Sequence, residues 1–262
     1  MRIVFRCDAS SDIGSGHVVR CRTLASALRR QGAEVAFLMR RLPGDMVDRL
    51  RADGFEAHLL AVADDALATQ ALLATAARPD WLVVDHYGLG IEWERRCAPL
   101  AGRLMVIDDR PGRQHDCDLL LDPNVSEEGA AHWSGRVPAG CRVLSGACYC
   151  LLRDEFRTAR QTLRQRDGRV HRILVCFGGS DPDGVAFLAL DALGRLAAQG
   201  RLDAVSIDVV AGAGNARAES LRAIAGGLAR ATFTTSADDM AERMAAADLA
   251  IGGGGGMLWE RC

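Results

Sequence analysis

The sequence predicts an α/β protein with two lobes, each built on a parallel β-sheet. Short β-rich apolar runs alternate with longer amphipathic segments, and parallel strands need such helical crossovers. The chain has 262 residues, 49% of them hydrophobic, which is enough for two packed cores. A polar stretch at 153–170 separates two such series. We therefore expect lobes at 1–152 and 171–262, joined by a linker helix at 153–170.

The first series begins with a strand at 2–6 and a helix at 17–32. The apolar residues of this helix recur at helical spacing, and Gly32 is a typical helix stop. Further strands are expected at 34–40, 81–88, 103–109 and 118–124. The last three strands each leave a polar residue at the carboxyl end, which is where ligands bind in open α/β sheets.

The second series begins with a strand at Arg172. Its later strands are expected at 204–212, 229–235 and 248–256, with a helix at 238–247. A last helix begins after Gly256, and the chain stops about a turn and a half later. From this we expect the second lobe to be truncated at its carboxyl end.

Composition excludes several classes of protein. A formal charge of -2 leaves no basic excess for nucleic acid or an anionic membrane, and no apolar window approaches the ~20 residues of a membrane span. The amino terminus enters a strand without a leader-like segment, so we expect a cytoplasmic protein. Nine scattered cysteines without a C-x-x-C pair argue against a disulfide scaffold and against zinc.

A histidine is the first candidate for chemistry. Within the segment DASSDIGSGHVVRC only His17 titrates near neutral pH, and it stands at the start of a predicted helix. The helix macrodipole there disfavours imidazolium, so a neutral ring could accept a proton at pH 7. A helix-capping or solvent-exposed His17 is the structural alternative.

Further candidates stand close to the predicted strand ends. Tyr87 could contact a sugar or polarise a water, or it could serve packing alone. Asp8 could orient His17 through a ring N–H, or it could close an Asx-turn. Asp116 and Asp118 form a D-x-D motif like that of metal-dependent sugar-nucleotide enzymes. We expect Asp118 to begin a strand, however, and predict no metal site here.

Two glycine-rich turns lead from strands into helices in the second lobe. Gly178 and Gly179 precede Ser180 and Asp181, either of which could cap the next helix, leaving amides that face an anion. Five glycines precede the last helix in the same way, and Glu260 within it would suit a ribose diol. Tight turns with an exposed glutamate are the alternative. Neither turn matches a P-loop or a G-x-G-x-x-G fingerprint.

A family resemblance rests on six motifs: FRCDASSDIGSGHVVRC, VVDHYG, IDDR, CDLLLDPN, CFGGSDPDG and GGGGGMLWE. In order and spacing they resemble those of the UDP-2,4-diacetamido-2,4,6-trideoxy-β-L-altropyranose hydrolases of pseudaminic acid biosynthesis, a route to flagellin glycosylation. That family resembles the GT-B glycosyltransferases. The resemblance therefore implies a GT-B-like fold of two Rossmann-like lobes, with the sugar in the first and UDP mainly in the second.

The resemblance also implies a mechanism and a site. His17 would activate a water that attacks the anomeric carbon and releases UDP with inversion, without metal or cofactor. The substrate would be a UDP-sugar, and we expect a monomer. The predicted catalytic residues are His17, Tyr87 and Asp8. The predicted substrate-binding residues are Gly14, Gly16, Arg20, His86 and Asn124. The predicted UDP-binding residues are Gly178, Gly179, Ser180, Gly254, Gly255, Gly256, Met257 and Glu260.

Two other functions stay open at this point. A GT-B glycosyltransferase could use the same histidine to deprotonate an acceptor hydroxyl, because similarity of fold does not select the acceptor. A nucleotide-sugar binding module with weak catalysis is the second, and the early stop at Cys262 makes it worth testing.

Overall fold

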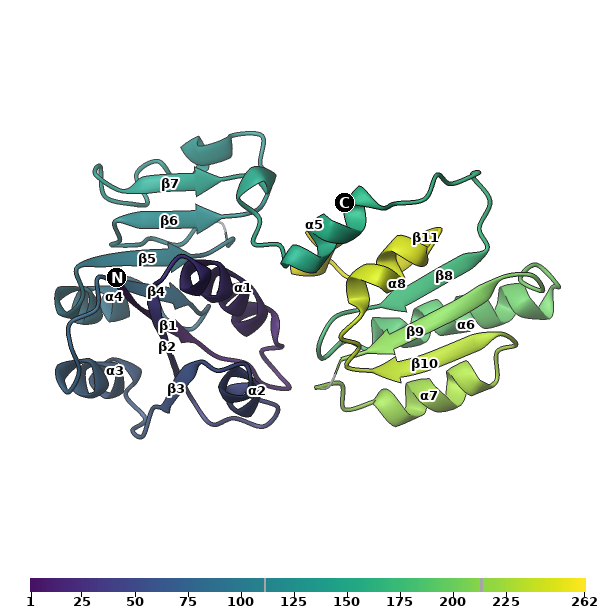
Figure 1. Ribbon diagram of the computed structural model, residues 1–262, viewed down its shortest axis with the longest axis horizontal. Coiled ribbons are helices and arrows are strands. Elements are labelled where there is room, and N and C mark those ends of the chain that lie inside the picture. The colour runs from purple at the N-terminus through teal and green to yellow at the C-terminus, as the bar shows by residue number, and fades with distance from the viewer. Residues whose placement is uncertain (111, 213) are drawn as a thin grey trace. The chain divides into compact units, whose positions relative to one another are not determined.

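The computed structural model describes residues 1–110, 112–212 and 214–262 (Figure 1). The chain divides into two compact units. The first unit comprises 1–9 and 17–151, and the second comprises 10–16 and 152–262. Each unit holds one parallel sheet with helices on its faces.

The first unit contains a seven-stranded parallel sheet in the order β3-β2-β1-β4-β5-β6-β7. Its strands are β1 (Arg2–Cys7), β2 (Glu34–Met39), β3 (Glu56–Leu59), β4 (Trp81–Asp85), β5 (Arg103–Ile107), β6 (Leu119–Asp122) and β7 (Arg142–Ser145). Its helices are α1 (Gly16–Arg30), α2 (Val47–Ala52), α3 (Asp65–Ala74) and α4 (Ile91–Cys97). The sequence analysis did not predict β3, β7 or the helices α2 to α4.

Side chains alternate between the two faces of this sheet, as the two-residue period of a strand requires. On β1, Phe5 and Cys7 join a core with α1 and α2, whereas Val4 joins a core that includes residues of α3 and α4. The sheet is therefore covered on both faces, which explains the continuous apolar runs of its central strands.

One position on β1 breaks the apolar pattern. Arg6 is completely buried, yet its guanidinium contacts the carboxylates of Asp8 and of Asp65 at the start of α3. Asp65 also accepts a hydrogen bond from the indole of Trp93 on α4. A buried charge is tolerated only when it is paired in this way, so this cluster ties β1 to α3 and α4.

The second unit contains a four-stranded parallel sheet in the order β10-β9-β8-β11. Its strands are β8 (Arg172–Cys176), β9 (Ser206–Ala211), β10 (Ala231–Thr235) and β11 (Leu249–Gly252). Its helices are α5 (Asp154–Gln161), α6 (Val185–Ala198), α7 (Ala218–Gly226), α8 (Met240–Ala246) and α9 (Gly256–Arg261). Helices α6 and α7 pack on one face, and residues of α5, α8 and α9 on the other.

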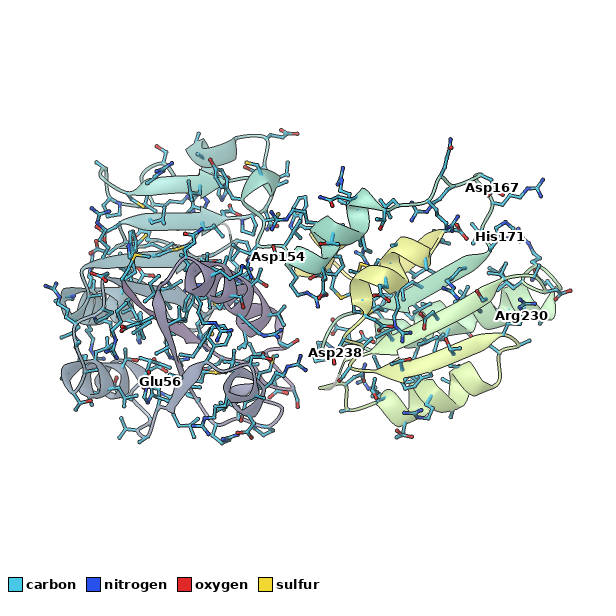
Figure 2. All side chains as sticks on the ribbon, in the orientation of Figure 1. Glu56, Asp154, Asp167, His171, Arg230 and Asp238 are labelled. Carbon is cyan, nitrogen blue, oxygen red and sulfur yellow. The ribbon has the colours of Figure 1, made fainter. Side chains whose placement is uncertain are left out.

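Helix α5 covers only part of the segment 153–170 that was expected to form a linker helix. Asp154 lies in its first turn, whereas Asp167 lies in the irregular stretch before β8 (Figure 2). Phe156 of α5 is buried against the second sheet, so this helix is part of the core of its unit.

Two glycines allow backbone segments to approach closely at the carboxyl edge of the second sheet. A Cβ atom on Gly212, after β9, would lie 2.3 Å from the carbonyl oxygen of Gly179. A Cβ atom on Gly252, at the end of β11, would clash with the carbonyl oxygen of Cys176 at the end of β8. The turns after β8, β9 and β11 can therefore pack together only because these positions lack side chains.

A buried histidine connects α4 to the segment after β5. The imidazole of His115 lies between Glu94, 2.6 Å from Nδ1, and Asp108, 3.2 Å from Nε2, and all three side chains are buried. Burial by itself would lower the pKa of His115. The hydrogen bonds and charges of Asp108 and Glu94 outweigh burial and raise this pKa to about 9.

We predict that this cluster makes stability depend on pH in the alkaline range. Because the folded pKa lies above the unfolded value, the imidazolium stabilises fully below about pH 6.5, and this contribution disappears as pH rises toward about 9. Urea unfolding between pH 6 and 9.5 should show this loss in the wild type. The loss should be smaller in His115→Gln. His58→Gln, which removes a partly exposed histidine, should keep the wild-type slope. A wild-type slope in His115→Gln would contradict the assignment.

Candidate functional site

The first candidate site lies where the strand order of the first sheet reverses. β1 and β4 are neighbours, and the chain leaves them toward opposite halves of the sheet. Such a switch point opens a crevice outside the carboxyl ends of the strands. His17 follows β1 in the first turn of α1, and Asp85 is the last residue of β4.

A histidine–carboxylate pair forms the centre of this site. The Nδ1 atom of His17 lies 2.5 Å from Oδ1 of Asp85, and both side chains are buried, at 5% and 0% exposure. An ionised carboxylate only accepts hydrogen bonds, so Nδ1 carries a proton, and in the neutral ring Nε2 is the proton acceptor. The sequence analysis expected Asp8 to orient His17. The structure corrects that choice, because Asp85 occupies this position.

Arginine compensates the buried charge of Asp85. Arg20, one helical turn after His17, donates from Nε to Oδ2 at 2.5 Å and from Nη2 to Oδ1 at 2.6 Å. Burial alone would raise the pKa of Asp85, but the charge and hydrogen bonds of Arg20 and the contact with His17 hold it at about 2. Asp85 is therefore ionised throughout the physiological range.

Tyr87 packs directly on His17. Its ring lies edge-on to the imidazole with centroids 4.5 Å apart, and the guanidinium of Arg110 lies 3.7 Å from the Tyr87 centroid. The phenol donates to Oδ1 of Asp109 at 2.6 Å. Burial and this contact raise the pKa of Tyr87 to about 12, so the phenol remains protonated. Packing and hydrogen bonding both hold this side chain.

Asp8 and His86 form a second pair near the first. The Nε2 atom of His86 lies 3.4 Å from Asp8, and its Nδ1 accepts from the amide of Gly88. The Asp8 carboxylate also accepts from Arg6 and from the amide of Arg40. Burial would raise the pKa of Asp8, but the contacts with His86 and Arg6 hold it well below its usual range.

The remaining candidates that were predicted for the first lobe are Gly14, Gly16 and Asn124, of which Gly14 and Gly16 belong to the second unit. Gly14 has a φ of +81° and exchanges backbone hydrogen bonds with Ser10, so this turn favours glycine. Gly16 begins α1. Asn124 is exposed after β6, and its amide donates to Asp122. Gly16 directly precedes His17 in the chain, whereas within the described residues neither Gly14 nor Asn124 makes a hydrogen bond with the His17–Asp85 pair.

The second candidate site lies at the corresponding position of the second sheet, between β8 and β11. Gly178, Gly179 and Ser180 follow β8, and Gly254, Gly255 and Gly256 follow β11. The two glycine-rich turns are thus brought together at one switch point, as expected for a shared ligand.

Asp181, one of the two residues predicted to cap the helix after the first of these turns, does accept hydrogen bonds from the amides that begin this helix. The carboxylate of Asp181 accepts from the amides of Val185 and Ala186, the first two residues of α6. Asp181 is buried with a φ of +45°, an unusual conformation for a non-glycine residue. The helix amides that were expected to face an anion therefore already have an anionic partner.

The residues after the second turn are also partnered. Met257 packs into the core, with its sulfur 3.9 Å from that of Cys176. Glu260 pairs with Arg153, with 3.0 Å between Oε1 and Nε, and its side chain is only 9% exposed. The alternative of a fully exposed helical glutamate is therefore wrong, while a contact with ribose stays a prediction.

The two aspartates of the D-x-D motif serve separate contacts. Asp116 pairs with Arg95, and Asp118 accepts from the amide of Leu104. Within residues 1–110, 112–212 and 214–262, no cluster of three or more histidine, cysteine or acidic side chains is arranged to hold a metal ion. In the same ranges no helix has the length and apolar character to cross a bilayer.

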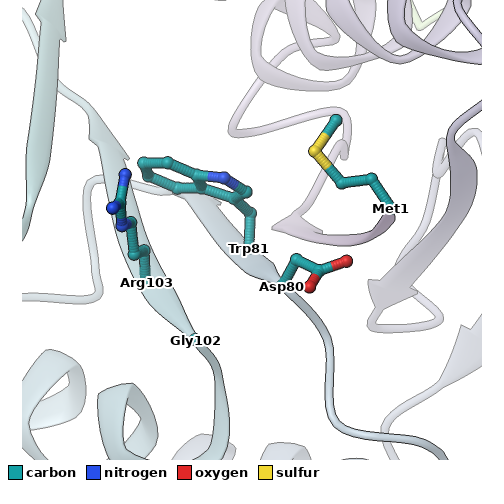
Figure 3. Close-up of a pocket in the computed structure, with 5 residues that line it drawn as sticks. All are labelled: Met1, Asp80, Trp81, Gly102 and Arg103. Atoms are coloured by element: carbon teal, nitrogen blue, oxygen red, sulfur yellow. The ribbon is translucent and has the colours of Figure 1, made fainter.

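A hollow opens at the amino-terminal ends of the strands of the first sheet (Figure 3). Its lining comprises Met1, Asp80, Trp81, Gly102 and Arg103. Trp81 begins β4, whereas Asp85 ends it, so the hollow and the His17–Asp85 pair lie at opposite ends of the same strand.

Sequence reasoning missed Asp85 and Asp109 as site residues. They belong to the motifs VVDHYG and IDDR, and each lies within a predicted strand, Asp109 at its end and Asp85 three residues before it. That position was the available signal. The pairing itself was not predictable, because it depends on which neighbouring strands α1 covers.

Comparison with curated proteins gives two similar chains. This chain is 29% identical over 181 residues to the UDP-2,4-diacetamido-2,4,6-trideoxy-beta-L-altropyranose hydrolase of Campylobacter jejuni, which covers 69% of this chain and 61% of that protein. It is 24% identical over 196 residues to an uncharacterized protein of Methanocaldococcus jannaschii, covering 74% and 40%. The chain thus spans less than two thirds of either relative's length. No protein-family model matches it.

Solved structures give the fold. UDP-GlcNAc 2-epimerase from Neisseria meningitidis, bound to UDP-GlcNAc, matches with a TM-score of 0.55 at 10% identity over 98% of this chain and 78% of that one. A trehalose 6-phosphate synthase from Burkholderia multivorans matches at 0.50 with 14% identity, over 94% and 75%. The expected α/β, GT-B-like fold with Rossmann-like lobes is confirmed, and so is the chain's resemblance to the altropyranose hydrolase.

Proposed function

We propose that this chain hydrolyses a UDP-linked 2,4-diacetamido-2,4,6-trideoxy-L-altrose and releases UDP and the free sugar. The observation that carries the proposal is the buried His17–Asp85 pair at the switch point of the first sheet. The similarity to the Campylobacter jejuni hydrolase supports the substrate class. The sugar released would serve pseudaminic acid synthesis and flagellin glycosylation in the cytoplasm.

The geometry supports a general-base mechanism. Asp85 accepts a hydrogen bond from Nδ1–H and so orients the imidazole, and Nε2 of His17 can then take a proton from water. The water oxygen then bonds to the anomeric carbon, and the electrons of the C–O bond leave with UDP, which inverts the centre. The leaving group is a phosphate oxyanion, so it needs hydrogen-bond donors more than a strong acid.

The second unit would hold UDP. The turns 178–180 and 254–256 supply backbone amides at one switch point, and Glu260 stands one turn into α9. The proposal involves no metal and no cofactor. Tyr87 would border the sugar, because its ring contacts His17.

Labelled water tests the bond that breaks. In oxygen-18 water without any alcohol acceptor, we predict that the label enters the sugar and that UDP is released unlabelled, as read by mass spectrometry. Label in UDP would instead indicate attack at phosphorus. Release of UDP only after an alcohol is added would favour the glycosyltransferase, and UDP binding without turnover would favour the binding module.

A substitution tests the base. His17→Asn should lower turnover by about 100-fold or more, the scale expected for loss of a general base, while UDP affinity stays near the wild-type value. His132→Asn removes a half-buried histidine far along the chain and serves as the control. Steady-state kinetics and calorimetric titration of UDP give the two readouts. Near-normal turnover of His17→Asn removes this residue from the mechanism.

Glu260 tests the nucleotide site separately. A charge-assisted hydrogen bond contributes ~1.5 to 3 kcal/mol, so Glu260→Ala should weaken UDP binding by roughly 10- to 150-fold. Glu155→Ala is the matched control, because it removes the other carboxylate that pairs with Arg153. Calorimetry with UDP measures both variants. If Glu260→Ala and the wild type bind UDP equally well, Glu260 does not contact the nucleotide and serves only the ion pair with Arg153.

A further inference from the structure

Arg20 has protein partners for all of its donor nitrogens in this site. Nε and Nη2 donate hydrogen bonds to the two carboxylate oxygens of Asp85, and Nη1 lies 3.2 Å from Oδ2 of Asp109. The side chain is 18% exposed. A guanidinium that bridges two carboxylates in a planar fork is held in one orientation, so it has little freedom to bind a substrate.

The bridge joins two side chains that carry protons. At one end, Asp85 accepts from His17 Nδ1; at the other, Asp109 accepts from the Tyr87 phenol. The imidazole and phenol rings also touch each other. Arg20 therefore completes a closed set of contacts. His17 is held by Asp85 and by the Tyr87 ring, and Tyr87 is held by Asp109 and by the His17 ring.

The charge of Arg20 bears directly on the imidazole. Nη2 lies 3.3 Å from His17 Nδ1. An uncompensated buried carboxylate beside a histidine strongly favours imidazolium, whereas a guanidinium that shares the carboxylate opposes it. The titratable and charged groups around this pair come from β1, α1, the end of β4 and the segment after β5: Cys7, Asp8, Arg20, Cys21, Asp85, His86, Tyr87, Asp109 and Arg110.

We propose that Arg20 is a positioning residue: it locks the His17–Asp85 pair to the Tyr87–Asp109 pair and keeps His17 in its proton-accepting form. The competing interpretation is the one predicted from the sequence, in which Arg20 binds the substrate. The catalytic consequence rests on the proposed function, whereas the effect on the imidazole does not.

Nuclear magnetic resonance tests the effect without any substrate. The His17 ring signals, assigned by their loss in His17→Asn, are followed against pH in wild type, Arg20→Met and Arg20→Lys. We predict that Arg20→Met raises the pH of half-protonation by about one unit or more, the scale expected when a cation within a few ångströms is removed. Arg20→Lys, which keeps the charge but not the fork, should lie in between. Arg22→Met, which removes another arginine of α1 and breaks its ion pair with Asp53 after α2, should match the wild type.

Kinetics with the UDP-sugar separate positioning from substrate binding. Arg20→Lys should lower kcat by about 10- to 100-fold with KM within about threefold of the wild type, because misplacement of the base affects the reacting geometry. The acid limb of its rate profile should move to higher pH. A raised KM with unchanged kcat would instead make Arg20 a substrate ligand.

A second variant covers the case in which Arg20→Met does not fold. Asp109→Asn keeps the size of a half-buried side chain but weakens its contacts with Arg20 and Tyr87. We expect Asp109→Asn to lower kcat. In the double variant with Arg20→Lys, the fall in kcat should be smaller than the product of the two single falls. An unchanged His17 titration in Arg20→Lys together with full additivity would overturn the proposal. If the titration moves but His17→Asn keeps full activity, the proposed function fails and the role of Arg20 in setting the imidazole stands.

Discussion

The buried charge of Asp85 is the constraint on which the first unit depends. A carboxylate excluded from solvent needs hydrogen-bond donors, and among the described residues those of Asp85 come from α1: His17, Arg20 and Cys21. These residues follow the i, i+3, i+4 spacing of one helix face. The same contacts that satisfy Asp85 therefore pin α1 to the end of β4 and fix the orientation of the imidazole, so that stability and the candidate chemistry share one interaction.

A second buried carboxylate strengthens this edge of the sheet. Asp8 is balanced by Arg6 and His86 and accepts the amide of Arg40 after β2, so it links the ends of β1, β2 and β4. Two acids close together would repel each other if they shared one cation. Asp8 contacts Arg6 and Asp85 contacts Arg20, so these two acids pair with different guanidinium groups, and the His86 and His17 ring centroids lie 6.5 Å apart. These contacts hold the side chains at the carboxyl ends of β1 and β4 in place beside the candidate site.

Much of this could be predicted from the sequence, because periodicity is local. The strands at 2–6 and 103–109, the helix after His17 and the glycine turns were all expected and are all present, with small shifts at their ends. Short edge elements such as β3 and β7 were missed, since four residues carry little periodic signal. The choice of Asp85 over Asp8 depends on strand order, and strand order is set by packing between residues far apart in the chain. Pairings such as Glu260 with Arg153, 107 positions apart, are unpredictable for the same reason.

The capping of α6 decides where a diphosphate could find its donors in the second unit. Asp181 supplies a carboxylate to the first two amides of α6, and a second anion placed there would meet this negative charge. Gly178 and Gly179 precede Asp181, so their amides lie outside that cap, and Gly179 is held against Gly212 by a contact that admits no side chain. If this unit binds UDP, the loop amides of 178–180 and 254–256 must carry the phosphates, and the glycines matter because they let the backbone itself approach the ligand.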